Sequence, residues 1–309
     1  MRSTLSILSI LITILLLELF TRFFLDNGMN YEIEMMKYAN DFKKISFDEK
    51  IGIEHKKNVS GKLMGASISL DGNGFRNYKK IIKNNKKIIM LGDSMTFGWG
   101  AKIPFSEQLD KKISSHDVLN AGIGNTNTIM QINNFFKNFK DLHDYDLIIL
   151  NFFINDFENI TIRKPNFFQK YSMLYTFLNN KISTVLIKFN LKKNWEDFYL
   201  DNYLDNEIKD ETLKIINQLN EYCLENNIKL IIHNIPELRD LKNYKFNKET
   251  QIIKNFAQQR KIKFLNSYDV LKKYEEKSLW VTIFDPHAND KAHKIIADFL
   301  YLNLKKYLN

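Results

Sequence analysis

The strongest constraint on the fold lies where an apolar run meets a short turn. Residues 88–91 read Ile-Ile-Met-Leu, and the chain then passes directly into Gly92-Asp93-Ser94. A short apolar run that ends at a glycine is typical of a buried strand, and Asp and Ser are residues that begin helices. The pattern therefore predicts a strand that brings a serine to the edge of an α/β sheet.

The alternation of strand and helix recurs along the chain. Apolar runs predict strands at 87–91, 118–119, 146–153, 229–235 and 262–265, and helical spacing predicts helices at 105–114, 130–139, 213–224, 252–259 and 292–304. Strands that are apolar throughout belong to parallel sheets covered on both faces. We therefore expect an α/β fold with a five-stranded parallel sheet between two helical layers, and function at the carboxyl ends of its strands.

Two stretches stand outside this alternation. Residues 26–80 carry no strong periodicity and are interpreted as a connecting segment, with a turn and an aromatic anchor at Asn73-Gly74-Phe75-Arg76. Residues at about 161–206 are rich in Phe, Tyr and Trp and are predicted to form a helical insertion, a candidate lid or substrate-contacting cap. The main domain is expected at 81–309.

The N-terminus has the length and composition of a membrane helix. Residues 3–17 carry no charge, and the mainly apolar run continues to Phe24. About 20 such residues cross a bilayer, a length that residues 5–24 supply. Glu18 and Arg22 are spaced to pair on one helix face near the outer interface. The alternative is a cleaved signal peptide, but no small-residue cleavage site follows, since the first alanine is Ala39. We expect residues 1–25 to be an uncleaved anchor, with the remainder outside the cytoplasm.

Composition argues against several other classes. The formal net charge is +9, but lysines are spread along the chain without a basic stripe, so we expect no nucleic-acid partner. The single Cys223 lies in a helical apolar stripe and is expected to be a buried, inert thiol. No Cys/His cluster has metal-ligand spacing, and no glycine pattern fits a nucleotide or flavin site. We expect neither metal nor cofactor.

Four polar motifs follow predicted strands or lie near the C-terminus. Ser94 is a candidate nucleophile, and the backbone N–H groups of Gly122-Ile123-Gly124-Asn125 could bind an oxyanion. Asn155-Asp156 could add an amide donor, and Asp285-Pro286-His287 offers a base with a carboxylate beside it. Each motif also has a structural reading, as a helix cap, a tight turn or an Asx turn. Their shared order points to acyl transfer by a serine.

The other five histidines have plainer interpretations. His55, His116 and His143 are expected in polar connections, His233 as a hydrogen-bonded core residue, and His293 in packing at the start of the last helix. None is expected to take part in chemistry.

Over roughly residues 70 to 300, the chain resembles the SGNH/GDSL hydrolase superfamily. The resemblance rests on Gly92-Asp93-Ser94, Asn120-Ala121-Gly122-Ile123-Gly124, Asn155-Asp156 and Asp285-Pro286-His287-Ala288-Asn289. Asn73-Gly74-Phe75-Arg76 and Phe97-Gly98-Trp99-Gly100 look like its bacterial, often membrane-anchored branch. It implies a flavodoxin-like three-layer fold, with Ser94 as nucleophile, His287 as base and Asp285 as its partner. It also implies an oxyanion hole of the Ser94 N–H, an N–H from Gly122, Gly124 or Asn125, and the Asn155 amide.

Two positions depart from the family pattern. The family's acid usually precedes its base by three residues, whereas Asp285 precedes His287 by two, so that Pro286 would have to hold a turn. In the second motif, Asn125 can be aligned where many members have glycine.

The expected function is a membrane-anchored, extracytoplasmic serine esterase acting on O-acyl groups, with acetyl groups of a cell-envelope saccharide as the leading substrate. Three alternatives stay open: an O-acyltransferase of extracellular polysaccharide with the same triad, a lipid esterase, and a non-catalytic saccharide-binding protein.

Overall fold

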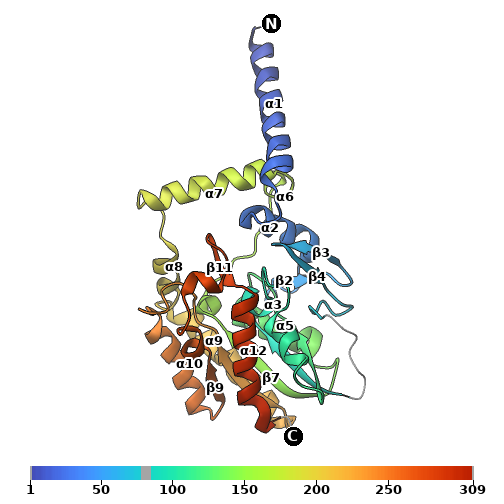
Figure 1. The fold of residues 1–309 in the computed structure, drawn as a ribbon, viewed down its shortest axis with the longest axis vertical. Helices are drawn as coiled ribbons and strands as arrows, with labels where there is room; N and C mark the ends of the chain where they lie inside the picture. The colour runs from blue at the N-terminus through green and yellow to red at the C-terminus, as the bar shows by residue number, and fades with distance from the viewer. Residues whose placement is uncertain (1, 78–84, 308–309) are drawn as a thin grey trace.

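A five-stranded parallel sheet forms the centre of the molecule, in the order β6-β5-β7-β8-β9 (Figure 1). The computed structural model describes residues 2–77 and 85–307. The strands are β5 (Lys86–Leu91), β6 (His116–Asn120), β7 (Tyr145–Phe152), β8 (Lys229–Asn234) and β9 (Lys263–Asn266). Numbered in chain order this is 2-1-3-4-5, the flavodoxin-like order, whose crevice opens at the carboxyl ends of the strands where the order reverses. The predicted fold class is confirmed.

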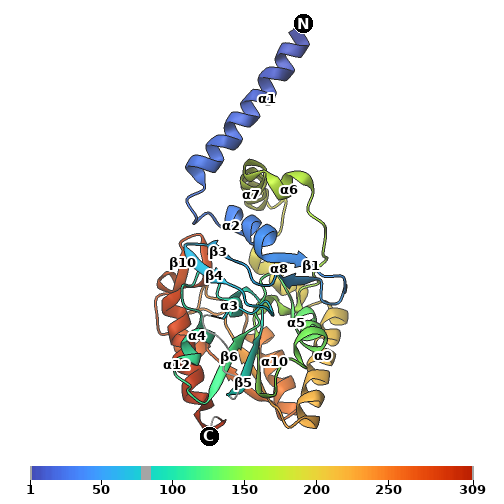
Figure 2. The same cartoon turned by 90° about the vertical axis from the view of Figure 1, so that its right-hand side faces the viewer.

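Helices cover both faces of the sheet (Figure 2). α4 (Phe105–Asp110) and α12 (Asp290–Leu304) pack together on one face. α5 (Thr128–Asn134), α9 (Asn206–Glu225) and α10 (Asn247–Gln259) lie on the other, and a π-helical turn at Phe135–Phe139 extends α5. The strand side chains between these layers, such as Ile88, Ile149 and Ile232, are fully buried, which is why the strands read as continuous apolar runs.

The structure moves the ends of two predicted helices. The helix predicted at 105–114 ends at Asp110. The helix predicted at 213–224 begins seven residues earlier, at Asn206, because the Asp205 side chain accepts hydrogen bonds from the N–H groups of Glu207 and Ile208 and so caps the helix. A capping aspartate, rather than the first apolar residue, sets that start.

The segment before the sheet is more ordered than its lack of periodicity suggested. It forms α2 (Tyr31–Lys37), a π-helical turn (Tyr38–Phe42) and two antiparallel pairs, β1 (Lys43–Ile45) with β2 (Ile53–His55) and β3 (Ser60–Leu63) with β4 (Ala66–Ser69). Phe75 is buried in the expected turn, where Gly74 has a φ of +84°. The predicted boundary between 80 and 81 lies outside the described residues.

The aromatic-rich insertion is helical, as predicted. It contains α6 (Phe167–Tyr171), α7 (Met173–Lys188) and α8 (Trp195–Asn202). At the other end of the chain, α1 (Arg2–Phe20) extends away from the domain (Figure 1), and the π-helical turn that follows it (Thr21–Leu25) contacts α7. Among the described residues, 2–25 is the one helical stretch long and apolar enough to cross a membrane.

Further short elements complete the fold. α3 (Ser94–Phe97) follows β5, a 3₁₀ turn (Ile154–Phe157) follows β7, and α11 (Tyr268–Leu271) follows β9. After a 3₁₀ turn at Glu276–Leu279, β10 (Trp280–Thr282) and β11 (Asp285–Ala288) form an antiparallel pair. The last strand carries the Asp-Pro-His motif to the carboxyl edge of the sheet.

Candidate active site

Ser94 is the first residue of α3, directly beyond the end of β5. Asp93 caps this helix, since its Oδ1 accepts a hydrogen bond from the Met95 N–H at 2.8 Å. Gly92 is required by the close turn, because a Cβ atom there would lie 2.1 Å from Thr96 Oγ1. The strand, the glycine and the cap together hold the Ser94 hydroxyl at the edge of the sheet.

The structure brings His287 and Asp285 to this serine from the far end of the chain. Ser94 Oγ lies 3.0 Å from His287 Nε2, and His287 Nδ1 lies 2.6 Å from Asp285 Oδ1. The two-residue spacing works because both residues belong to β11, and residues two apart on a strand point to the same side. The extended strand β11 therefore brings the Asp285 and His287 side chains together, and the turn at Pro286 that the sequence suggested is not needed.

The carboxylate fixes which nitrogen of His287 carries the proton. An ionised Asp285 can only accept, so Nδ1–H donates to it and Nε2 is left to accept from the Ser94 hydroxyl. Burial by itself lowers the pKa of His287, but the charge and hydrogen bond of Asp285 outweigh burial, and the net pKa is raised. The same pairing outweighs burial at Asp285 and lowers its pKa.

Trp99 is a contact that the sequence interpretation missed. Its indole Nε1–H donates to the second carboxylate oxygen of Asp285, Oδ2, at 2.9 Å. Both side chains are almost fully buried. The Phe97-Gly98-Trp99-Gly100 stretch had stood out in the sequence, but nothing in it indicated that the indole would bind a carboxylate 186 residues away.

Two of the candidate oxyanion donors are already engaged. The Gly122 N–H donates to Asn120 Oδ1 and the Gly124 N–H to Tyr38 Oη, both at 3.0 Å. Gly122 also packs against α3, where a Cβ would lie 2.3 Å from the Phe97 nitrogen. Neither N–H group is thus the free donor that the sequence suggested, and Asn125 is left as the second-motif candidate.

Asn125 adopts the backbone conformation that a glycine would favour, with a φ of +63°. Lys43 Nζ donates to the Gly124 carbonyl at 3.2 Å. That carbonyl shares a peptide unit with the Asn125 N–H, and the two groups of a trans peptide point in opposite directions. Lys43 thereby turns the Asn125 N–H away from itself, and Asn125 lines the pocket.

A buried hydrogen-bonded chain supports this loop from behind. The His55 Nδ1–H faces the Gly74 carbonyl at 3.0 Å, so its Nε2 accepts from the Tyr38 hydroxyl at 2.7 Å. Burial lowers the pKa of His55 to about 3, which keeps the ring neutral. The expectation that His55 lies in a polar connection is therefore wrong: it is buried and orients Tyr38, which holds Gly124.

Asn155 lies in the turn after β7, as predicted, and lines the same pocket as Ser94. Its side chain forms a hydrogen bond with Asp93, whose pKa burial raises. An amide nitrogen has two hydrogens, so one can serve Asp93 while the other donates into the pocket. Asp156, the next residue, is buried and accepts from Gln131 Nε2 and the Phe153 N–H.

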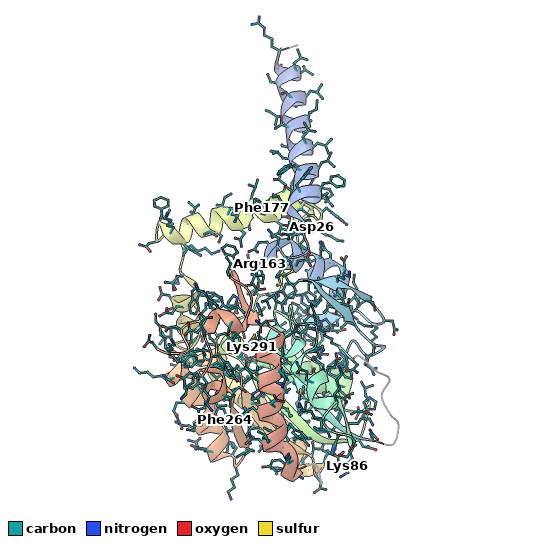
Figure 3. All side chains as sticks on the ribbon, viewed as in Figure 1. Asp26, Lys86, Arg163, Phe177, Phe264 and Lys291 are labelled. Atoms are coloured by element: carbon teal, nitrogen blue, oxygen red, sulfur yellow. The ribbon has the colours of Figure 1, made fainter. Side chains whose placement is uncertain are left out.

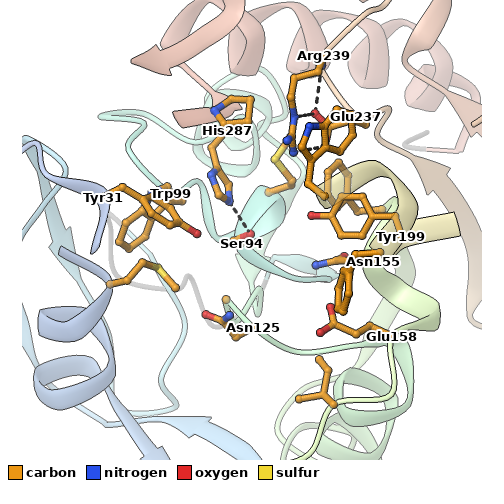
Figure 4. A pocket seen from close by; sticks show the side chains of 18 of the residues that line it. Tyr31, Ser94, Trp99, Asn125, Asn155, Glu158, Tyr199, Glu237, Arg239 and His287 are labelled. Carbon is orange, nitrogen blue, oxygen red and sulfur yellow. Dashed lines mark hydrogen bonds and ion pairs between the residues drawn. The ribbon is translucent and has the colours of Figure 1, made fainter. Parts of the chain in front are cut away.

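The pocket over Ser94 has a volume of about 240 Å³. Residues from separate stretches along most of the chain line it, as Figure 4 shows. Its aromatic wall comes from the insertion, through Trp195, Phe198 and Tyr199 of α8, and from α2 through Tyr31, whose ring stacks on His287. The predicted cap does line the pocket, but the part played by α2 was missed.

Glu237 and Arg239 form the polar part of the pocket wall. They follow β8 just beyond Pro236, and the Arg239 guanidinium binds the Glu237 carboxylate through Nε at 2.8 Å and Nη2 at 3.1 Å. Arg239 also lies 3.6 Å from the centre of the Trp195 ring. Polar residues directly after a buried strand were the sequence signal that could have identified this pair.

The remaining candidates have structural roles. His233 bonds Asn151 and Ser267 in the core, as predicted, and His293 is buried and accepts from the Phe105 N–H. Cys223 is buried, and burial raises its pKa to about 12. Among residues 2–77 and 85–307, no group of three or more His, Cys, Asp or Glu side chains is arranged to hold a metal ion.

The fold and the site together define the class. This is a flavodoxin-like α/β protein in which a serine, a histidine and an aspartate form a hydrogen-bonded series at the carboxyl edge of the sheet.

Comparison with known proteins adds a likeness of fold. No family model and no curated protein matches the chain. Among solved structures it is similar to a Bacteroides fragilis protein provisionally described as an acylhydrolase (18% identity, TM-score 0.47, covering 75% of this chain and 92% of that one). It is also similar to a G-D-S-L family lipolytic protein from Veillonella parvula (13%, 0.45, 72% and 99%) and an acetylxylan esterase from Geobacillus stearothermophilus (13%, 0.45, 73% and 96%). At such values the likeness assigns no activity, and function has to be argued from the site.

Proposed function

We propose that this chain is a serine esterase of the SGNH/GDSL type, with Ser94 as nucleophile, His287 as general base and Asp285 as the group that orients it. The observation that carries the proposal is the series Ser94 Oγ, His287 Nε2, His287 Nδ1 and Asp285 Oδ1, with separations of 3.0 and 2.6 Å. A nucleophile and base within 2.6–3.2 Å, with the base oriented by a third group, is the arrangement that activates a hydroxyl.

The reaction follows from these contacts. The Ser94 hydroxyl gives its proton to His287 Nε2 as its oxygen attacks the ester carbonyl. The ester C–O bond then breaks, the departing alcohol takes the proton from His287, and the acyl group stays on Ser94. Water next gives a proton to His287 as its oxygen attacks the acyl carbon. The bond between the acyl carbon and Ser94 Oγ then breaks, His287 returns the proton to Ser94 Oγ, and the acid leaves. We assign the oxyanion to the N–H groups of Ser94 and Asn125 and the amide of Asn155, on the grounds that Gly122 and Gly124 already donate elsewhere.

The proposed substrate is an O-acyl ester of a saccharide, with acetyl as the leading acyl group. The support is the pocket wall. Trp195 and Tyr199 provide flat apolar faces, and Glu237 and Arg239 provide hydrogen-bonding groups for hydroxyls. The apolar α1 favours a location at the cell membrane, and the proposal puts the domain on its outer side.

Hydrolysis of p-nitrophenyl acetate and longer acyl homologues by the full chain in detergent, beside Ser94→Ala, tests the activity. We expect turnover to fall to background in Ser94→Ala while the circular dichroism spectrum stays unchanged, because Ser94 is only partly buried. Activity that survives Ser94→Ala would refute the mechanism. A folded wild-type chain that turns over neither these esters nor an acetylated oligosaccharide would refute the esterase assignment.

An O-acyltransferase would share the acyl-enzyme and differ in what removes the acyl group. Adding an unacylated oligosaccharide to the assay separates the two. Transfer of acetyl to the sugar at the expense of free acetate would replace hydrolysis with transfer as the function.

A further inference from the structure

α7 carries apolar side chains on the face turned away from the domain. Leu178, Ile182 and Val185 are 46%, 58% and 51% exposed, and their spacing of four and three residues puts them on one side of the helix. Exposed aromatic residues flank α7 at both ends, Tyr171 before it and Phe189 after it. An exposed apolar stripe of this length is unusual on a soluble surface and marks a site of interaction.

The opposite face of α7 packs on the protein through polar side chains and through Met173, the one buried residue of the helix. Thr176 Oγ1 contacts Met36 Sδ of α2 at 3.3 Å, and the Asn180 side chain forms a hydrogen bond with Glu32 of α2. A surface helix normally turns its apolar face inward. In α7 an apolar stripe faces outward instead, and no part of the described chain covers it.

The candidate membrane helix and α7 are joined at their ends. Glu18 of α1 accepts hydrogen bonds from the N–H groups of Met173 and Leu174, both at 3.0 Å, and from Ser172 Oγ at 2.7 Å. Arg22 donates to the Tyr171 carbonyl at 2.5 Å. A carboxylate at a helix N-terminus is favourable because it meets unpaired N–H groups. α7 therefore begins beside the C-terminal end of α1.

Both views show α7 running crosswise to α1 at this point, with the sheet domain on its other side (Figures 1 and 2). Because α2 covers its inner face, the apolar stripe faces the side from which α1 leads away. Figure 3 shows side chains of α7 standing clear of the domain there. If α1 spans a bilayer, the stripe lies at the level where the bilayer begins.

The charges around the stripe match a lipid surface. The exposed basic residues between positions 160 and 190 are Arg163, Lys164, Lys170, Lys181 and Lys188. Helices that lie in the membrane interface combine an apolar face with flanking lysines, whose long side chains reach anionic headgroups. Such lysines are attracted to an anionic leaflet.

We propose that residues 166–189, which comprise α6 and α7, lie in the plane of the membrane interface and bind a bilayer with anionic headgroups. The anchor α1 and this interfacial segment then contact the membrane together, one across the bilayer and the other along its surface. A single membrane anchor leaves the orientation of a domain relative to the bilayer free, whereas two membrane contacts fix which side of the domain faces the lipid.

If the protein is an esterase, as proposed above, this position of α7 limits which substrates reach the active site. α2 lies between α7 and the pocket, and its Tyr31 and Met35 line that pocket. The active site is therefore held close beneath the lipid surface at a set height. It therefore acts on esters presented close to the membrane surface rather than on freely diffusing polymers.

Site-directed spin labelling of the full chain in nanodiscs tests whether α7 lies in the membrane interface. Labels at Ile182→Cys and Val185→Cys are compared with one at Lys214→Cys, an exposed position on α9, with Cys223 left in place because it is buried. In discs with anionic phosphatidylglycerol we expect the α7 labels to be shielded from an aqueous relaxation agent and exposed to oxygen. That corresponds to roughly 5–10 Å below the headgroups. The α9 label should stay water-accessible.

Two results would overturn the proposal. One is equal aqueous accessibility of the α7 and α9 labels. The other is spin–spin broadening at Ile182→Cys without a gain in oxygen accessibility, which would assign the stripe to a second copy of the chain. The measurement needs no turnover, so its failure is distinct from a failure of the esterase assignment. Where the labels do lie in lipid, the double variant Ile182→Asp and Val185→Asp should raise the aqueous accessibility of a label at position 189. Its hydrolysis of a soluble ester should be unchanged.

Discussion

At the scale of single residues, the pairing of Asp285 with His287 governs the acidic side of the pH profile. The pKa of His287 is raised, so the ring stays protonated to a higher pH than a free histidine would and cannot act as a base there. The activity should therefore rise with pH through a midpoint above the usual value of about 6.5.

Asp285→Asn removes the charge that raises this pKa. We expect the acidic midpoint of kcat/KM to move down, because burial then acts without the opposing carboxylate. We also expect kcat to fall by about 10⁴, since an amide can hold the wrong tautomer. A pH–rate series on a soluble ester measures both quantities. An unchanged or higher midpoint in Asp285→Asn would contradict the pairing.

Lys43 governs the alkaline side by acting on the oxyanion loop. Burial lowers the pKa of its ammonium to about 8, so its charged hydrogen bond to the Gly124 carbonyl is present below pH 8 and lost above. We predict that kcat declines with a midpoint near pH 8, and that Lys43→Met removes this decline. The variant should lower kcat by about tenfold, less than the 10²–10³ typical for losing a direct oxyanion donor.

The control for Lys43 is Lys43→Arg, which keeps a charge at all working pH values. Its kcat should exceed that of Lys43→Met and should show no decline near pH 8. A purely structural role for Lys43 would lower thermal stability in both variants and leave the alkaline limb in place.

At the scale of elements, the sequence predicts those helices and strands whose form depends on residues close together in the chain. The sheet strands are recognisable because each is apolar throughout, and Ser94, Asn155 and His287 stand out because polar residues follow those strands or close the chain. The segment at 26–77 is not recognisable, because its strands have three or four residues and its core residues, such as Tyr38, are buried by contacts with distant Phe97 and Trp99. Short elements of this kind owe their form to tertiary packing.

The same reason explains which site residues were missed. Nothing near Trp99 predicts a bond to Asp285, and nothing near Tyr31 predicts a ring on His287, since both contacts join residues far apart in the chain. The engagement of the Gly124 N–H could not be predicted for the same reason, because its acceptor, Tyr38, lies 86 residues away. The Gly122 N–H, in contrast, is engaged locally, by Asn120 two residues earlier.

α8 is the element whose role in binding can be separated from catalysis. Trp195 forms one pocket wall and is stacked beneath Arg239. We predict that Trp195→Ala raises KM for an acetylated oligosaccharide by about 3- to 10-fold, the range expected for losing one aromatic contact, with kcat for p-nitrophenyl acetate within about twofold. Steady-state kinetics on both esters measures this. Tyr274→Ala, an exposed aromatic residue outside the pocket, should change neither.

At the scale of the whole molecule, three parts far apart in sequence depend on one another. The helix α1 caps α7, α7 packs on α2, and α2 lines the pocket that β11 completes with His287. A domain boundary drawn from sequence between an anchor, a connecting segment and a hydrolase domain separates residues that the fold brings together.

The last prediction concerns the anchor itself. We expect the intact chain in cell membranes to retain residues 1–25 by mass spectrometry and to resist extraction by alkaline carbonate, because α1 is long and apolar enough to span a bilayer. A cysteine introduced at Lys214 should react with a membrane-impermeant maleimide added outside the cells, while Cys223, buried and with a raised pKa, should not. Leu11→Arg together with Leu15→Arg should release the chain, since each arginine at the centre of a membrane helix costs about 2.5–3.5 kcal/mol. A mature chain that lacks the first 25 residues would identify them as a signal peptide instead, and labelling only after the cells are opened would reverse the proposed orientation.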